Sequence, residues 1–455
     1  MNHHTLTAIA PVDGRYHNKT HELKSIFSEY GLIKHRVIAE IRWLQALMNH
    51  DAIQALNKPS VDANAYLEAM INQFSEADAQ RIKAIEVTTN HDVKAVEYFI
   101  KEKLQHHDEL KTTVEFIHFA CTSEDINNIA YALMLKSARD DVFLPYLDQV
   151  IEQLTVQAHL YADIAMLSHT HGQAASPTTV GKELANFVAR LKRQRQQFID
   201  IKIMGKMNGA VGNFNVHCVA YPTVDWQDVA KQCITDMGLE WNAYTTQIEP
   251  HDYIAELMHV MLRIHTILID YARDTWAYIS KAYFQQKLVA NEVGSSTMPH
   301  KVNPIDFENA EGNLGLANAI CQHMANALMT SRLQRDLTDS TLLRNLGLCF
   351  GYSLIALKAL LKGMNKLQIN QAKITQDLQA NWAVLGEALQ TVMRRDGLEK
   401  PYEQLKQLTR GQTVDQATLI RFIDNLALPA ETKAQLKQLS PENYIGIAAQ
   451  LAKAI

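Results

Sequence analysis

Cysteine, proline and glycine are all scarce in this sequence. Among 455 residues there are 5 cysteines, 11 prolines and 18 glycines. The cysteines are odd in number and widely spaced, and no two form a CxxC pair, so the reduced thiols of a cytosolic protein are the simplest interpretation. Because proline and glycine are the main interrupters of helices, their scarcity leaves long stretches that can stay helical.

The sequence also lacks a long run of apolar residues. The longest, Leu346–Leu357, is too short to span a bilayer and predicts a buried core helix instead. The first residues, Met1–His4, lack the apolar run of a signal peptide. We therefore expect a cytoplasmic protein with no membrane partner.

A strong excess of one charge is absent as well. The formal net charge is -5, from 44 Lys and Arg against 49 Asp and Glu. Proteins that coat nucleic acid usually carry a basic stripe, so no nucleic-acid partner is expected. An anionic small substrate is still allowed, because a pocket needs only a few local cations.

What the sequence has in quantity is helical periodicity. Residues 179–206 space their apolar side chains as an amphipathic helix does. Residues 251–288 are apolar on nearly all sides, which places that helix at the centre of a bundle or of an oligomer. No strict alternation is long enough to support a sheet. The sequence predicts an all-α fold with three helical domains, at residues 1–111, 112–364 and 365–455, of which the middle one is a bundle of long helices.

One loop, residues 294–304, interrupts the helical sequence with a glycine, hydroxyl side chains and two prolines. Such a loop should be exposed. Backbone N–H groups near Gly294 and the charge of Lys301 suit a carboxylate ligand, and they would also lower the cost of ionising Ser295. An ordinary connection between two helices is the alternative.

A second stretch, residues 168–173, carries His169 and His171. Their i, i+2 spacing is only a weak metal hint, since neither a helical HExxH nor a nearby cysteine or carboxylate completes a ligand set. We therefore expect no metal and no cofactor. A histidine that leads into a helix N-terminus is better suited to proton transfer near neutral pH.

Two polar stretches stand at expected helix starts. Thr122 and Ser123 precede an apolar run, which indicates a helix N-cap, although free N–H groups at such a start also bind anions. Asn90, His91 and Asp92 form a second start, where capping by Asn or Asp is the simpler interpretation.

Arginines supply the remaining candidates. Arg15, between Gly14 and Tyr16, belongs either to a surface turn or to a guanidinium fork for a phosphate. Arg335 and Arg344 lie among acidic residues, and a solvated ion-pair face is the usual outcome for such runs.

In this order and spacing, the stretches together resemble the shared regions of the fumarase/aspartase superfamily. Residues 295–304, Ser-Ser-Thr-Met-Pro-His-Lys-Val-Asn-Pro, look like its signature loop. Residues 170–173 and 122–125 resemble the other two shared regions. The resemblance runs from residue 14 to residue 344 and covers nearly the whole chain.

Further details are similar to the longer bacterial members of the adenylosuccinate lyase family. They are His300 and the stretches 89–94, 209–213 and 333–340. This family implies a homotetramer whose core is the middle bundle, with each active site built from three subunits. It also implies elimination of fumarate from adenylosuccinate, giving AMP, and from SAICAR, the succinylated aminoimidazole carboxamide ribotide, giving AICAR, in purine biosynthesis.

The resemblance implies a role for each matching residue, with Ser295 as the general base and His171 as the general acid. The succinyl carboxylates would be held by Thr122, Ser123, Lys301 and Asn303. The nucleotide, chiefly its phosphate, would be held by Arg15, Tyr16, Arg335, Ser340 and Arg344. The pocket would be completed by Asn90, His91, Asp92, Gln247 and Asn309, with His91 as a bridge between the phosphate and His171.

Three alternatives stay open. Carboxymuconate cycloisomerases share the histidine at position 300, but they need no ribose-phosphate grip, so Arg15–Tyr16 and Asn90–Asp92 argue against them. A non-catalytic structural relative could lose Ser295 or His171 at no cost, and both are present. A metal hydrolase is the third, and metal analysis of the purified protein would test it.

Overall fold

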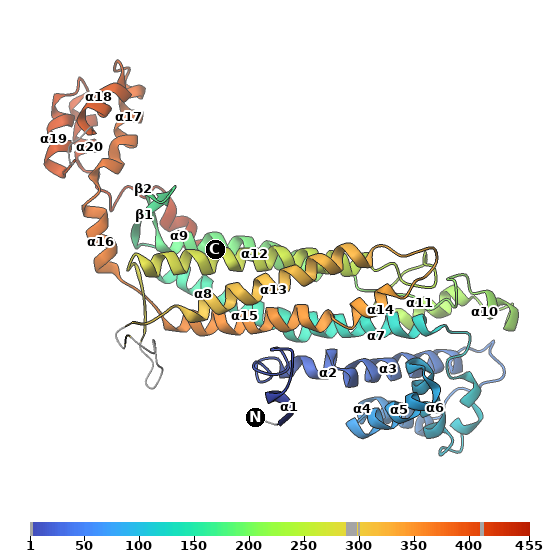
Figure 1. Cartoon of the computed structure of the whole chain (residues 1–455). Helices are drawn as coiled ribbons and strands as arrows, with labels where there is room; N and C mark the ends of the chain where they lie inside the picture. Colours follow the sequence, from blue (N-terminus) through green and yellow to red (C-terminus); the bar gives the residue numbers. More distant parts are fainter. Residues whose placement is uncertain (1–2, 288–297, 299–300, 410–413) are drawn as a thin grey trace. The chain divides into compact units, whose positions relative to one another are not determined.

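The computed structural model is helical over most of its length, as the sequence predicts (Figure 1). It describes residues 3–287, 298, 301–409 and 414–455. The first helices are α1 His3–Leu6, α2 Lys24–Phe27, α3 Glu29–Met48, α4 Val61–Asn72, α5 Glu76–Thr89, α6 Asp92–Leu104, α7 Ser123–Ser137, α8 Leu144–Leu160, α9 Val180–Asp200, α10 Asn215–Ala220 and α11 Trp226–Asp236. The later ones are α12 Asp252–Ser280, α13 Ile305–Leu328, α14 Thr338–Leu343, α15 Leu346–Lys366, α16 Gln371–Gln379, α17 Gly386–Arg395, α18 Pro401–Thr409, α19 Gln416–Asn425, α20 Ala430–Lys437 and α21 Ala448–Lys453.

Short helical turns and strands fill the connections. The 3-10 turns are η1 His21–Leu23, η2 Leu110–Thr112, η3 Val114–Phe116 and η5 Trp382–Leu385, and η4 Ala138–Phe143 is a π-helical turn between α7 and α8. The strands are β1 Ala165–Thr170, β2 Gln173–Thr179, β3 Met204–Gly205, β4 Glu240–Trp241, β5 Phe284–Gln286 and β6 Leu367–Ile369. They form three separate pairs, β1–β2 and β5–β6 antiparallel and β3–β4 parallel.

The chain divides into two compact units. The first consists of residues 1–147, 195–266 and 312–358, and the second of residues 148–194, 267–311 and 359–455. The long helices α8, α9, α12, α13 and α15 contribute residues to both units. The three domains expected from the sequence, with boundaries after residues 111 and 364, stay a prediction.

Helix α3 lies at the centre of the first unit. Ser28 starts it by accepting the Gly31 N–H at 3.1 Å, and the helix then packs against α7. Trp43 of α3 is fully buried, and its Nε1 donates to the carbonyl of Phe119 at 2.9 Å. This bond fixes the segment just before α7, so the core of the unit also positions Thr122 and Ser123.

A buried polar contact joins three long helices within the first unit. His265 of α12 is completely buried, with Asn318 of α13 and Ser353 of α15 each at 2.9 Å from its ring nitrogens. Burial lowers the pKa of His265 to about 4, so its ring is neutral. A satisfied polar contact of this kind fixes the register in which helices pack.

The second unit contains the β1–β2 hairpin, the β5–β6 pair and the C-terminal helices. Helices α17 to α20 build a core of their own, in which Leu389, Met393 and Ile423 are completely buried. The hairpin turn has positive φ at both central residues, 53° at His171 and 74° at Gly172, as two-residue hairpins of type I′ require.

The all-α class is confirmed, and the described residues contain only short strand pairs, of which the hairpin is the longest. His171 therefore lies in the turn between β1 and β2 and does not lead directly into a helix, since α9 begins only at Val180. The predicted helix 251–288 ends early, at Ser280, because Ala282 has φ 59° and the chain then enters β5. Hydrophobic spacing did not predict the β1–β2 and β5–β6 pairs because the strands are short. In addition, β5 and β6 lie far apart in sequence.

One stretch of the described residues, Thr338–Lys366, is long and apolar enough to cross a membrane by length and composition. Its apolar run Leu346–Leu357 is by itself too short to span a bilayer. In the structure, 67% of the most apolar window is buried inside the protein. That burial agrees with the prediction of a core helix.

Candidate active site

The predicted site residues fall in both units. The first unit holds Arg15, Tyr16, Asn90, His91, Asp92, Thr122, Ser123, Gln247, Arg335, Ser340 and Arg344. The second holds His171, Lys301, Asn303 and Asn309. Ser295, the predicted base, lies outside the described residues, as does His300.

Thr122 and Ser123 stand at the start of α7, where the N-cap interpretation is confirmed. The Thr122 N–H donates to Asp125 Oδ2 at 2.8 Å, which forms half of a capping box. Asp125 also accepts from the backbone N–H groups of Asn208 and Gly209, at 2.9 and 3.1 Å. Its carboxylate lies 2.9 Å from Lys206 Nζ, and both side chains are completely buried. The helix start is thus fixed from behind, while Thr122 and Ser123 stay partly exposed.

Arg335 is surrounded by polar groups of the first unit. Its Nη1 donates to Glu124 Oε2 at 2.9 Å and to Gln247 Oε1 at 3.4 Å. Its Nη2 lies 3.6 Å from Asp339 Oδ1, and the Ser340 N–H donates to that same oxygen at 2.6 Å. The structure therefore brings together Arg335, Gln247 and Ser340, three residues that the resemblance assigned to one pocket.

Arg344 forms a second cationic centre. Its Nη2 lies 2.8 Å from Asp92 Oδ2, an oxygen that also lies 2.8 Å from Nη2 of the buried Arg36. Burial would raise the pKa of Asp92, but the charges of Arg36 and Arg344 lower it below its ordinary value. Arg344 also lines a pocket of about 460 Å³ together with Asp13 and Asn345. An anion held here would face an arginine whose position is already fixed.

The turn between α5 and α6 contains Asn90 and His91. Asn90 ends α5 in the left-handed conformation, with φ 50°. The expected capping of α6 by Asn or Asp was wrong, because the His91 side chain accepts the Lys94 N–H at 3.1 Å in that role. Arg15 is exposed and its guanidinium lies 5.9 Å from the ring centre of Tyr16, in a turn closed by the Gly14 N–H to the Ala10 carbonyl at 3.0 Å.

The predicted residues of the second unit lie nearer to solvent. His171 is exposed at the tip of the hairpin, and Lys301 is exposed before α13. Asn303 and Asn309 are partly buried, the latter within α13. The ring of the nearby His169 packs 5.8 Å from that of Tyr283, and burial lowers the pKa of His169.

A buried ionisable cluster that the sequence did not predict lies behind Arg335. Among the described residues, Glu124, His251 and Asp339 place one ligand-type atom each within 4.8 Å of one another. Arg335 already supplies a cation to both carboxylates, so the geometry fits an ion-pair network better than a metal site. A lone histidine before a helix and a glutamate after a cap give no pattern in the sequence, which explains the omission.

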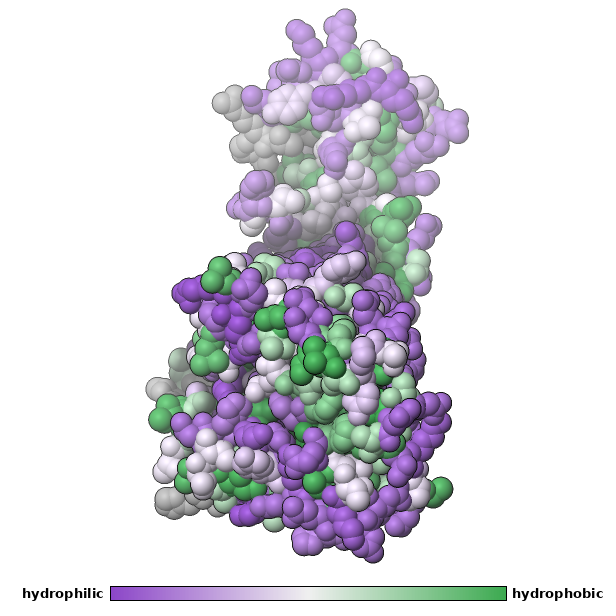
Figure 2. Space-filling view, turned by 90° about the vertical axis from the view of Figure 1, so that its right-hand side faces the viewer, coloured by the Kyte–Doolittle hydropathy of each residue, from purple (hydrophilic) through white to green (hydrophobic). Residues whose placement is uncertain are grey.

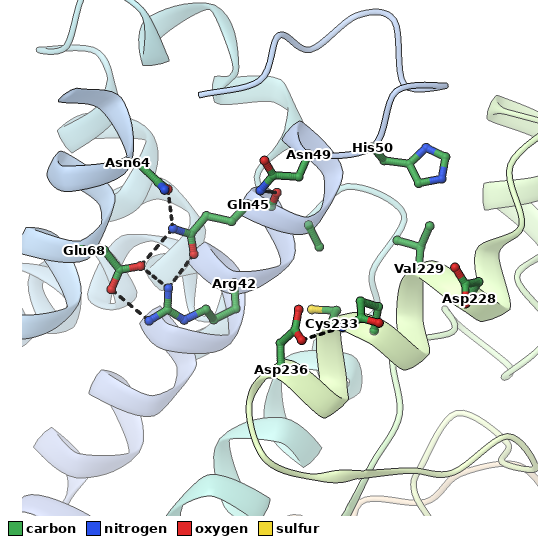
Figure 3. Close-up of a pocket in the computed structure, with 12 residues that line it drawn as sticks. Arg42, Gln45, Asn49, His50, Asn64, Glu68, Asp228, Val229, Cys233 and Asp236 are labelled. Atoms are coloured by element: carbon green, nitrogen blue, oxygen red, sulfur yellow. Dashed lines mark hydrogen bonds and ion pairs between the residues drawn. The ribbon is translucent and has the colours of Figure 1, made fainter. Parts of the chain in front are cut away.

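A pocket of about 520 Å³ elsewhere in the first unit contains none of the predicted residues (Figure 3). Its polar side chains bind one another. Arg42 pairs with Glu68, and Gln45 donates to Asn64 Oδ1 at 2.9 Å and to Glu68 Oε1 at 3.0 Å. With these groups satisfied internally, the pocket adds nothing to the candidate active site.

Comparison with known proteins covers nearly the whole chain. Residues 14–319 match the family described as Lyase, and residues 331–445 match the family described as adenylosuccinate lyase C-terminal. The adenylosuccinate lyase of Escherichia coli K12 is 59% identical over 97% of this chain and 97% of its own length. Those of Vibrio cholerae and Haemophilus influenzae are 58% and 56% identical, covering 98% and 99% of this chain and 98% of each relative.

Solved structures share the fold at much lower identity. The 3-carboxy-cis,cis-muconate lactonizing enzyme of Pseudomonas putida matches with a TM-score of 0.73 and 19% identity, covering 95% of each chain. The β-carboxy-cis,cis-muconate cycloisomerase of Acinetobacter calcoaceticus matches with a TM-score of 0.71 and 17% identity, over 95% of this chain and 97% of the other.

Proposed function

This chain belongs to the adenylosuccinate lyase family, and from that membership we propose that it eliminates fumarate from adenylosuccinate to give AMP, and from SAICAR to give AICAR. The observation that carries the proposal is the pair of cationic centres in the first unit, Arg335 and Arg344. The Arg335 guanidinium is oriented by the buried Glu124 and the Arg344 guanidinium by the half-buried Asp92, and both keep an edge near the surface, as binding of an anionic nucleotide requires.

In the proposed reaction, Ser295 removes a proton from the succinyl carbon next to a carboxylate. The electron pair forms the carbon–carbon double bond of fumarate as the carbon–nitrogen bond breaks. His171 protonates the departing nitrogen, which would otherwise be a poor leaving group. The carbanion character that develops is delocalised into the neighbouring carboxylate, and fixed positive groups must face it.

The binding residues divide by the part of the substrate they would contact. Thr122, Ser123, Lys301 and Asn303 hold the succinyl carboxylates in this proposal, by hydroxyls, an ammonium and an amide. The partly exposed start of α7 adds N–H groups that favour negative charge. Arg15, Tyr16, Arg335, Ser340 and Arg344 hold the nucleotide, and Asn90, His91, Asp92, Gln247 and Asn309 complete the pocket.

The active form is proposed to be a homotetramer in which three subunits contribute to each site. Large apolar side chains of the long helices support this, because Val156 of α8, Trp276 of α12 and Leu316 of α13 are 58%, 47% and 53% exposed in the single chain. On one face of the molecule hydrophobic side chains gather among hydrophilic ones (Figure 2). Light scattering after size-exclusion chromatography should give four times the mass of one chain, and a monomer would contradict the proposal.

The deciding experiment follows the absorbance of adenylosuccinate with the purified protein and with its Ser295→Ala variant. Conversion to AMP and fumarate by the wild type, lost in the variant, is the expected result. Conversion that survives Ser295→Ala would keep the reaction but remove Ser295 as the base. No conversion by the intact oligomer would overturn the function in favour of a cycloisomerase or a non-catalytic relative.

A further inference from the structure

Behind Arg335, the first unit buries a cluster of charges that the proposed mechanism does not use. His251, Glu249 and Glu124 are 2%, 1% and 2% exposed, and Asp339 is 9% exposed. With Arg335 they make three carboxylates facing two potential cations. Only Arg335, with 19% of its side chain exposed, reaches from the cluster toward solvent.

His251 is held at the centre of this cluster by backbone and side-chain contacts. Its N–H donates to Glu249 Oε2 at 2.8 Å, and its carbonyl accepts from Ile254 and Ala255 at the start of α12. Its Nδ1 lies 3.7 Å from Glu249 Oε2 and its Nε2 lies 3.5 Å from Asp339 Oδ2. The histidine backbone has φ 65°, a conformation that non-glycine residues adopt only where surrounding contacts enforce it.

The charges that face His251 come from four segments. They are Glu249 before α12, Glu124 in α7, Asp339 in α14 and Arg335 in the preceding loop, with the buried Tyr253 phenol beside them. Burial alone would lower the pKa of His251, but Asp339 and Glu249 raise it to about 9. The imidazole is therefore a cation at neutral pH.

Two of these carboxylates, those of Glu124 and Asp339, also contact Arg335. Glu124 accepts from Arg335 Nη1 through its Oε2 at 2.9 Å, while its other oxygen, Oε1, is buried with no hydrogen-bond partner. Asp339 lies between the two cations, with Oδ1 near Arg335 and Oδ2 near His251. If His251 were neutral, both carboxylates would be balanced by Arg335 alone, and less of its charge would be left for a ligand.

We propose that His251 is a positioning residue that shares the carboxylates of Glu124 and Asp339 with Arg335, and so leaves the guanidinium available for the phosphate of the substrate. This inference rests on the proposed function for the identity of the ligand. His251 itself touches no substrate. It acts through Arg335, and its removal should weaken nucleotide binding without slowing the chemical step.

The test uses His251→Asn in the full-length oligomer, because asparagine tolerates positive φ and cannot carry the charge. We expect KM for adenylosuccinate, and the Kd for AMP measured by calorimetry, to rise about tenfold, the size of a coupling between neighbouring charges. The kcat should change by less than about twofold, since uniform binding is what is lost. An unchanged KM and Kd would overturn the proposal.

The double variant His251→Asn with Glu249→Gln separates charge balance from damage to the fold. Glu249 does not contact Arg335, yet its removal restores the balance of charges, so most of the lost affinity should return. Additive loss in the double variant would show a purely structural role and overturn the proposal. Circular dichroism and thermal melting of each variant establish that folded protein is compared.

The single variant Glu249→Gln gives a measurement that does not depend on folding of His251→Asn. In the wild type, KM should rise at alkaline pH as His251 loses its proton. Removing the Glu249 carboxylate lowers the pKa of His251, so in Glu249→Gln this rise in KM should begin at a lower pH. Coincident profiles would contradict the inference. If the wild type binds AMP but does not turn over adenylosuccinate, the proposed function fails. That outcome is distinct both from shifted and from coincident KM profiles.

Discussion

The two units present their predicted site residues in different ways. In the first unit, Arg335 and the start of α7 are held by the buried carboxylates of Glu124 and Asp125, and Arg344 is held by the half-buried Asp92. In the second unit, His171 lies at an exposed hairpin turn and Lys301 is exposed. A surface fixed by buried charges suits binding of a ligand in one orientation, whereas exposed groups need another surface to complete their surroundings. We therefore expect the residues proposed for proton transfer to depend on assembly more than those proposed for nucleotide binding.

The largest expected effect comes from breaking a buried ion pair of the first unit. Asp125→Asn leaves the completely buried Lys206 ammonium without its partner, and we expect the free energy of unfolding to fall by about 3–5 kcal/mol. The matched control is Asp163→Asn, which removes an exposed partner of Lys453 and should change stability by less than about 1 kcal/mol. Urea unfolding measures both, and equal effects would mean that the Asp125 pair adds nothing by being buried.

The second prediction concerns the exposed hairpin. His171→Ala should reduce kcat by about 10²-fold or more, as loss of a general acid does, with little change in thermal stability because the residue is exposed. His159→Ala, at another exposed histidine of the same unit, is the control and should retain full kcat. Near-normal turnover of His171→Ala would remove it from the chemistry.

Mixing two inactive variants tests whether His171 and Ser295 act from different subunits. If His171 and Ser295 reach one site from different subunits, tetramers reassembled from equal amounts of His171→Ala and Ser295→Ala should regain about a quarter of the wild-type sites by random assortment. The assay is adenylosuccinate turnover after denaturation and joint refolding. Persistent inactivity, with wild type refolded in parallel as an active control, would place both residues on one subunit.

A smaller effect is expected at the fixed arginine. Arg335→Gln should raise KM by about 10–100-fold, because a charge-assisted contact to phosphate is lost, while kcat falls less. Arg332→Gln changes the same charge three residues away, at a side chain that is 81% exposed, and should leave KM within about twofold. Equal KM values for both variants would remove Arg335 from the nucleotide site.

The smallest effect is a dependence of stability on pH in the first unit. The pKa of His251 is raised from 6.5 to about 9, so its contribution is complete below pH 6.5 and is lost as pH rises through 9. Between pH 7 and 10 the Tm of the wild type should therefore fall by a few °C more than the Tm of His251→Asn. Parallel Tm curves for the two proteins would mean that His251 is not protonated in the folded state.

The sequence predicted the helices better than their ends. Apolar spacing located α9 and α12, but the hairpin before α9 was missed because its two strands pair by backbone hydrogen bonds that leave no alternation to read. The early end of α12 at Ser280 has the same origin, since β5 pairs with β6 far along the chain. The resemblance placed Arg335, Gln247 and Ser340 together, and the structure confirms their proximity; the roles of His171 and Ser295 stay predictions.

The sequence by itself determined the helical class, the family and the order of the polar stretches along the chain. These follow from local spacing and from motifs that each occupy a few consecutive residues. Only the tertiary structure decided that Glu124, Glu249, His251 and Asp339 form one buried cluster with Arg335, and that Arg36 and Arg344 share Asp92. The physical reason is that charge balance inside a protein depends on distances between segments far apart in sequence, which local patterns do not encode.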